Sequence, residues 1–326
     1  MQSEKSKPPI TVYGAIVSNL IIAIIKYIVA SLTGSSAMLS EGIHSTADTG
    51  NELLLLLGLR QSRKPADESH PFGYGQELYF WSLIVAIILF SSGGGMSMYE
   101  GIIHLTRSVE LRDPTWNYFV LGVAFVVEGV SWLIALRELL KRKDADVGFW
   151  QGFRASKDPS VFIVFGEDTA ALAGLIVAFS GVFLGQLFDS HYPDAIASII
   201  IGLILAAVAI FLAYESKSLL VGETASRKTV KGIRREVLSH PAVERMRRPL
   251  TMHFGPDEIL LNLDVQFDAD LQAAELVKVI DELEMNIRDK YPGINRIFIE
   301  VEGFRNPKKD KLGEKDGNER FTKTDK

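Results

Sequence analysis

The sequence predicts an α-helical membrane domain followed by a small water-soluble domain of mixed helix and strand. The chain has 326 residues, of which 47% are hydrophobic, and its mean hydropathy is positive. The apolar residues gather in runs within the first two thirds of the chain, and each run is long enough to cross a hydrocarbon core of about 30 Å. The last third is charged. We expect membrane spans at 11–32, 36–59, 78–104, 115–140, 161–187 and 193–214.

Composition limits the partners and the chemistry of the chain. The net charge of -5 and the lack of a basic cluster with interleaved aromatic residues argue against nucleic-acid binding. With no cysteine, the chain has no disulfide, thiolate metal site or cysteine nucleophile. Any metal must therefore be held by His, Asp, Glu, Asn or backbone oxygens.

The distribution of basic residues predicts the orientation in the bilayer. Lysine and arginine are concentrated in the loops after the second and fourth spans. By the positive-inside rule, both termini are cytoplasmic. We expect a multi-pass protein of the bacterial inner membrane, with a cytoplasmic tail at 1–10, a transport domain at 11–220, a cytoplasmic domain at 221–303 and a disordered charged tail at 304–326.

The second span carries the polar residues that suggest a function. His44 and Asp48 are four residues apart, so they share one face of a helix. Glu41 precedes them by one turn, Asn51 follows by one turn, and all four fall on one stripe. Ionisable groups at membrane depth usually face a bundle interior or a wet cavity and mark an ion path. The alternative is a buried His-Asp pair that only joins helices.

The phrase from Ser35 to Asn51, SSAMLSEGIHSTADTGN, resembles the second transmembrane helix of the cation diffusion facilitator family, which exports divalent metals. This resemblance implies six transmembrane helices and a ferredoxin-like, metallochaperone-like cytoplasmic domain through which the protein forms a homodimer. It implies a transporter and not an enzyme. Most members hold the metal with two His and two Asp from the second and fifth helices.

The fifth span departs from that pattern. It reads VFGEDTAALAGLIV, from Val164 to Val177. By the resemblance, Asp168 takes the place of the family's second Asp and Val164 the place of its histidine, so one nitrogen ligand is missing. Glu167 is a possible replacement ligand, although adjacent helical residues point about 100° apart. Both acids could also simply occupy the first turns of the helix. The EDTAA phrase, Glu167 to Ala171, resembles the zinc transporter nine-like branch.

Other polar residues of the spans have structural explanations. Asn19 is expected to make a hydrogen bond between helices. Lys26 is expected to pair with a carboxylate of the bundle, and Glu128, which has no basic neighbour in sequence, is a candidate for that partner.

The loop after the second span resembles one in which some family members hold a second, superficial metal. The matching positions here read Asp67, His70 and Tyr74. Tyrosine is a poor replacement for the last ligand, so the sequence gives only a weak second site at Asp67 and His70.

The region after Gly222 has the periodicities of a folded domain. We expect a helix at 226–239, a strand near 243–252, a strand at 259–267, a helix at 271–291 and a strand at 294–301. This α-β-β-α-β order resembles the family's cytoplasmic domain. From Phe304 onward the chain has almost no apolar content, which predicts disorder.

Together these features predict efflux of a divalent cation by proton-coupled alternating access. Zn²⁺ is the first choice as substrate, with Mn²⁺, Fe²⁺ or Co²⁺ as alternatives, protons are the coupling ion, and no cofactor is permanently bound. His44, Asp48 and a carboxylate of the fifth span are the expected ligands, with Asn51 as a possible further one. The rival is a non-transporting membrane-anchored metal sensor or scaffold. An intramembrane hydrolase is disfavoured because the chain has no HExxH or comparable motif.

Overall fold

The computed structural model describes residues 10–106, 114–142, 159–301 and 320–322. The described chain forms two compact units. The first runs to Pro65 and from Gln76 to Lys217, and the second comprises Ala66–Gly75 and the chain from Ser218. The predicted N-terminal tail, the loop around 143–158 and most of the charged tail lie outside the described residues.

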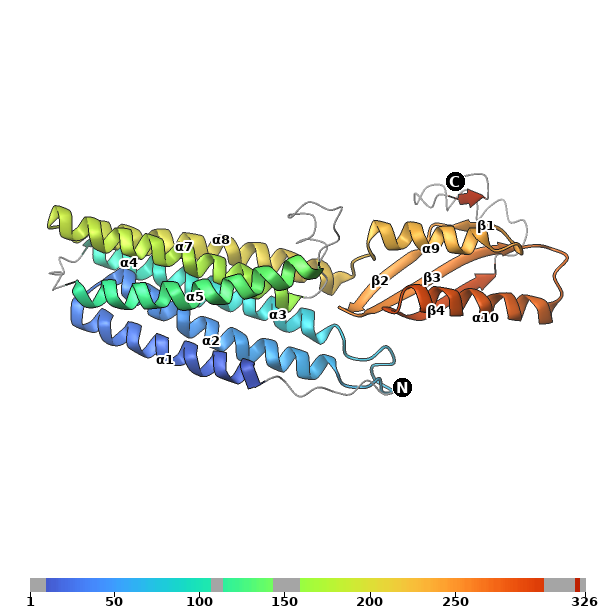
Figure 1. Ribbon diagram of the computed structural model, residues 1–326, viewed down its shortest axis with the longest axis horizontal. Helices are drawn as coiled ribbons and strands as arrows, with labels where there is room; N and C mark the ends of the chain where they lie inside the picture. The colour runs from blue at the N-terminus through green and yellow to red at the C-terminus, as the bar shows by residue number, and fades with distance from the viewer. Residues whose placement is uncertain (1–9, 107–113, 143–158, 302–319, 323–326) are drawn as a thin grey trace. The chain divides into compact units, whose positions relative to one another are not determined.

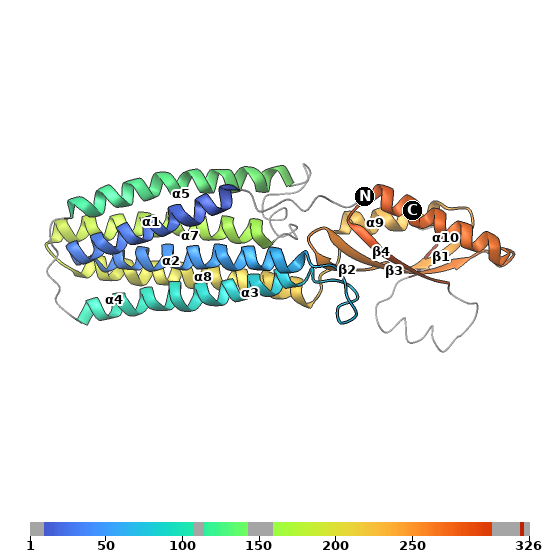
Figure 2. The same ribbon diagram turned by 90° about the horizontal axis from the view of Figure 1, so that it is seen from below.

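The first unit is a bundle of long helices that lie side by side (Figures 1 and 2). Helix α2 contacts α1, α3, η1, α4 and α7, so the helix that carries His44 and Asp48 lies among its neighbours and not at the edge. The elements of this unit are α1 (Ile10–Thr33), α2 (Ser36–Ser62), α3 (Glu77–Ile88), η1 (Leu89–Gly95), α4 (Met96–Thr106), α5 (Thr115–Arg142), α7 (Pro159–Phe188) and α8 (Tyr192–Val221).

The outer surface of this bundle is apolar. On α5, for example, Phe119, Val126 and Ile134 are each more than 60% exposed, a surface that suits lipid and not water. Four described segments are long and apolar enough to span a membrane: Glu77–Thr106, Thr115–Arg137, Phe162–Phe188 and Tyr192–Val221. Within α1 the apolar stretch Asn19–Thr33 is shorter, and α2 carries several acidic residues, so spanning by these two helices stays a prediction.

The third predicted span is not a continuous α-helix. The run Leu89–Gly95 is a π-helix between α3 and α4. Gly94 lies so close to α8 that a β-carbon would be 3.1 Å from the backbone oxygen of Gly202. The small residues of this run therefore allow two helix backbones to approach closely, as small residues do in membrane bundles.

The start of α2 is fixed by a side chain of α8. Gly34, with a φ of 75°, closes the tight connection between α1 and α2. The buried Asp194 carboxylate accepts hydrogen bonds from the hydroxyl of Ser35 (2.6 Å), and from the backbone N–H (2.6 Å) and hydroxyl (2.9 Å) of Ser36. These bonds satisfy donors that a helix N-terminus otherwise leaves unpaired.

We expect Asp194→Asn to destabilise the bundle by about 2 kcal/mol, because an amide nitrogen cannot accept the hydrogen bonds that the carboxylate accepts now. The matched control is Asp189→Asn, which changes an exposed carboxylate at a φ of 47°, a conformation that asparagine tolerates. Thermal unfolding in detergent measures both. Equal Tm values for the two variants would contradict this role of Asp194.

The second unit contains a mixed sheet covered by two helices. Its elements are α9 (Arg227–Ser239), β1 (Val243–Arg247), β2 (Leu250–Gly255), β3 (Glu258–Phe267), α10 (Ala273–Lys290), β4 (Ile294–Val301) and β5 (Arg320–Thr322). Strand β4 pairs in parallel with β3 along one edge, and β1 and β2 pair antiparallel with successive parts of β3. Buried residues of α9 and α10, such as Ile233, Leu283 and Ile287, form one core with the strands.

Two details differ from the expected α-β-β-α-β order. The strand expected near 243–252 is two short strands, with Arg248 and Pro249 between them; proline has no N–H to donate to the sheet, which explains the break. The segment expected to be disordered contains β5, which pairs antiparallel with β1, with Phe321 opposite Met246. Pairing with a free strand edge gives this short polar stretch a partner that composition does not reveal.

Candidate metal centre

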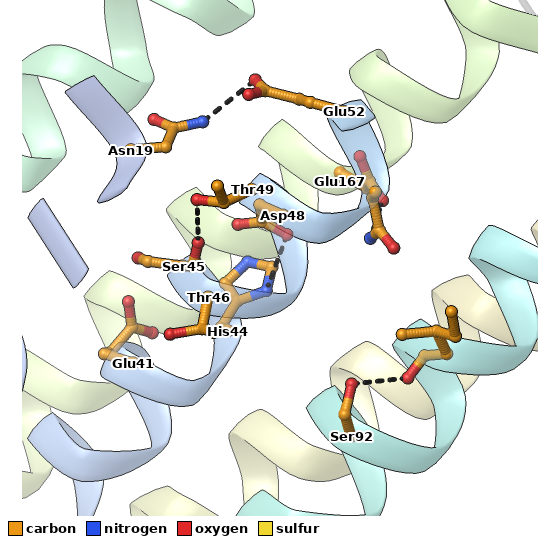
Figure 3. Close-up of polar contacts among 12 residues, drawn as sticks. Asn19, Glu41, His44, Ser45, Thr46, Asp48, Thr49, Glu52, Ser92 and Glu167 are labelled. Atoms are coloured by element: carbon orange, nitrogen blue, oxygen red, sulfur yellow. Dashed lines mark hydrogen bonds and ion pairs between the residues drawn. The ribbon is translucent and has the colours of Figure 1, made fainter. Parts of the chain in front are cut away.

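The structure places His44 and Asp48 together inside the bundle. Ser35 starts α2 as an N-cap by accepting a hydrogen bond from the Met38 N–H (3.1 Å). The i,i+4 spacing then brings Nδ1 of His44 to 3.2 Å from Oδ1 of Asp48 (Figure 3). The His44 side chain is 1% exposed and that of Asp48 15%. Apart from this contact with each other, neither ring nitrogen of His44 nor Oδ1 of Asp48 has a partner among the described residues.

Asn51 connects this face of α2 to α7. Its Nδ2 donates a hydrogen bond to Oε1 of Glu167 (2.6 Å), and both residues are buried. The other amide atom, Oδ1, is buried without a hydrogen-bond partner among the described residues. Glu167 is therefore the carboxylate of α7 that reaches α2, and Figure 3 shows it beside this helix.

Asp168 is directed to a different helix. Its Oδ2 accepts a hydrogen bond from the Ser131 hydroxyl of α5 (2.8 Å). Since neighbouring residues of a helix point about 100° apart, one acid faces α2 and the other faces α5. The sequence favoured Asp168 as the ligand and Glu167 as the reserve; the contacts of the two side chains favour the opposite order.

As it stands, this cluster is an incomplete ligand set. Nowhere in the described part of the chain do three His, Asp or Glu side chains converge closely enough to hold a metal ion. However, buried polar atoms without a hydrogen-bond partner are costly, and Nε2 of His44 and Oδ1 of Asn51 are two such atoms on one face of α2 within the described residues. One imidazole with carboxylate and amide oxygens is a donor set that Zn²⁺ accepts and that also suits Mn²⁺.

Two further polar pairs of the bundle join α1 to α2. Asn19 donates a hydrogen bond to Oε1 of Glu52 (3.0 Å), which confirms the expected interhelical bond. Lys26 pairs with Glu41, at 3.1 Å between Nζ and Oε2, and not with Glu128. The candidate pairing of Lys26 with Glu128 was therefore wrong, because the rotation of each helix, and not distance along the chain, decides which carboxylate is within reach.

The loop Ala66–Gly75 is organised by hydrogen bonds. Oδ1 of Asp67 accepts from the backbone N–H of His70 (2.7 Å) and from the hydroxyl (2.7 Å) and N–H (3.0 Å) of Ser69. Its Oδ2 accepts from the Tyr74 hydroxyl (2.6 Å). Tyr74 thus takes up a carboxylate oxygen at the position where the resembling loops have a metal ligand, and the weak second site at Asp67 and His70 stays a prediction without structural support.

These hydrogen bonds, led by that from Tyr74, hold the pKa of Asp67 below its ordinary value. We expect the pKa to rise in Tyr74→Phe, because the strongest donor to the ionised form is lost. At pH values above the ordinary aspartate pKa, the lowered pKa of Asp67 stabilises the folded loop. This contribution to the free energy of unfolding disappears as the pH falls through the lowered pKa. This contribution to stability should be smaller in Tyr74→Phe than in wild type. Carboxyl-carbon NMR titration measures the shift, and an unchanged pKa would contradict it.

Comparison with known proteins identifies the family of the chain. The family profile of the cation efflux transmembrane domain matches residues 12–221. The chain belongs to the cation efflux family. Members of this family are also called cation diffusion facilitators, and this chain is a zinc transporter nine-like member. It is accordingly an integral membrane protein, with a helical membrane domain followed by a C-terminal domain.

Several relatives of this cation efflux protein are zinc antiporters. The mitochondrial proton-coupled zinc antiporter SLC30A9 of Xenopus laevis is 35% identical over 237 residues, covering 72% of this chain and 42% of the relative. The Homo sapiens antiporter of the same name is 31% identical over 255 residues, 78% of this chain and 45% of the relative. The chain thus spans less than half the length of these antiporters. The manganese efflux system protein MneP of Bacillus subtilis is 24% identical over 296 residues, 89% of this chain and 94% of the relative.

Proposed function

We propose that this cation efflux protein exports Zn²⁺ in exchange for protons, with the ion held by His44, Asp48 and an acid of α7. The observation that supports this most directly is that Nδ1 of the buried His44 faces Oδ1 of Asp48 at 3.2 Å, while Nε2 of His44 has no hydrogen-bond partner within the part of the bundle that the structure describes. We place Glu167 before Asp168 as the α7 ligand, and Asn51 beside it, because Asn51 and Glu167 are in contact.

The exchange follows from the chemistry of these ligands. Metal binding requires a neutral imidazole and ionised carboxylates, so metal ions and protons compete for the same groups. An ion that enters from the cytoplasm displaces protons from His44 and Asp48. After the helices open the site to the other side, protons arriving down their gradient displace the ion.

Zn²⁺ is the proposed substrate because one imidazole and carboxylate oxygens suit it and because the first relatives are named as zinc antiporters. With a single nitrogen ligand, selection against Mn²⁺, Fe²⁺ or Co²⁺ is weaker than at a site with two histidines. The relative named as a manganese efflux protein makes Mn²⁺ the first competitor to measure.

We further propose that the protein is a homodimer joined through its C-terminal domain, with both termini cytoplasmic. That domain exposes apolar side chains, among them Leu250 (56%) and Phe298 (52%), which a partner surface would cover. A bacterial inner membrane remains our proposal for the location; the zinc antiporters with which the chain aligns are named as mitochondrial.

Reconstitution tests this function. The purified protein is placed in liposomes that contain a zinc-sensitive dye, a pH gradient is imposed, and Zn²⁺ entry is followed, with protein-free liposomes as the control. We expect uptake that depends on the gradient and collapses with a protonophore. If neither Zn²⁺ nor Mn²⁺ enters, the membrane-anchored sensor or scaffold replaces the transporter, and His44 and Asp48 then matter only for stability.

A further inference from the structure

A lysine ammonium is buried beside the proposed metal site. Lys26 of α1 is 1% exposed, and its Nζ donates hydrogen bonds to Oε2 of Glu41 (3.1 Å) and to Oγ of Ser45 (2.8 Å). Glu41 is fully buried. A positive charge at this depth requires a partner, and α2 provides both acceptors. The pair is therefore a fixed part of the bundle.

Only half of the Glu41 carboxylate is engaged. Its Oε1 is buried and has no hydrogen-bond partner among the residues that the structure describes. This oxygen lies against Gly174 of α7, where an added β-carbon would be 2.6 Å away. Gly174 comes seven residues after Glu167 and thus lies on the same face of α7, two turns further along. Glu41 consequently presents a free oxygen lone pair to the helix that provides the α7 acid.

His44 and Asp48 lie between two contacts that join α2 to α7. One is Glu41 against Gly174, and the other is Asn51 with Glu167. Between Gly174 and Glu167, α7 presents small buried residues, Ala170 and Ala171. Figure 3 shows Glu41, His44 and Asp48 following one another along α2.

Glu41 is therefore one helical turn from His44, which lies between the two contacts that join α2 to α7 at the proposed site. If Glu41 also bound the ion, the site would gain a full negative charge and one more oxygen ligand. A transport site must release its ion as well as bind it, and a further carboxylate in a low-dielectric interior would oppose release.

We propose that Lys26 is a tethered cation that occupies Glu41 and keeps this carboxylate from binding the transported metal, and that it thereby sets the affinity of the site. The proposal rests on the function proposed above. Lys26 is a positioning residue in this scheme, since it touches Glu41 and Ser45 and not the cargo. It differs from a simple interhelical ion pair, which would only stabilise the contact between α1 and α2.

The two explanations predict different effects on metal affinity. In Lys26→Met the freed Glu41 carboxylate can bind the ion, so the Kd for Zn²⁺ should fall by about tenfold or more and turnover should slow. In Glu41→Gln the unpaired ammonium repels the ion, so the Kd should rise by about tenfold. The double variant Lys26→Met/Glu41→Gln removes both charges, and its Kd should return to within about threefold of wild type.

The experiment titrates Zn²⁺ into each purified full-length variant in detergent, at one mildly alkaline pH, and measures unfolding in the same samples. Opposite shifts of Kd in the single variants support a tethered cation. If Zn²⁺ binding is unchanged or weakened in both single variants and their Tm is lower, Lys26 and Glu41 form only an ion pair that stabilises the contact between α1 and α2. Should Lys26→Met not fold, the comparison of Glu41→Gln with the double variant decides, because removal of the ammonium must then strengthen binding. No Zn²⁺ or Mn²⁺ binding by wild type would instead overturn the proposed function itself.

Discussion

Replacement of Asp48 by asparagine should lower proton-driven Zn²⁺ uptake by about 100-fold or more. The side chain keeps its size, but the negative charge that faces the His44 ring at 3.2 Å is lost. An amide oxygen is a weaker ligand for Zn²⁺ than a carboxylate and cannot exchange a proton for the metal. The initial rate of uptake into dye-loaded liposomes, normalised to folded protein, measures the effect.

Asp189→Asn is the matched control, because the same change then affects an exposed acid that belongs to no proposed metal site. Its uptake rate should stay within about threefold of wild type. If folded Asp48→Asn protein transports Zn²⁺ at a comparable rate, Asp48 does not belong to the site, and a role in joining helices would explain its burial.

Local patterns were sufficient to predict most of the secondary structure. The helical stripe of α2 and the alternation in β3 each follow from the spacing of apolar residues. The α-β-β-α-β order of the C-terminal domain followed in the same way. The details of its sheet could not be predicted in this way. The first expected strand is split at Pro249, and the pairing of β5 with β1 depends on which strand edge is free.

Contacts between helices could not be derived from spacing alone. Asp194 suits the first turn of its own helix, yet its carboxylate caps α2. Lys26 has several acids within the bundle as possible partners, and only the rotation of α1 and α2 selects Glu41. The order of Glu167 and Asp168 depends in the same way on the rotation of α7, which the resemblance to the family does not determine. The sequence therefore indicated the candidate ligands of α2 but left the proposed α7 ligand open.

The second large effect is expected at Glu167, the acid of α7 that faces α2. We expect Glu167→Gln to lower Zn²⁺ uptake by on the order of 100-fold and to weaken Zn²⁺ binding. Glu167 is 6% exposed and accepts a hydrogen bond from Asn51, so its carboxylate is already directed to α2. Glutamine keeps the length of the side chain while removing the charge and the proton-exchanging group. Uptake into liposomes and Zn²⁺ titration in detergent measure the two consequences.

Asp168→Asn is the internal comparison, since it neutralises the adjacent acid, which is bonded to Ser131 of α5. We expect a loss of less than about tenfold, because this carboxylate would contribute to the negative potential around the ion and not to its coordination. Equal losses in the two variants would mean that both acids reach the ion during the cycle. A larger loss in Asp168→Asn would reverse the assignment, and would show that α7 rotates between the conformation described and the one that binds metal.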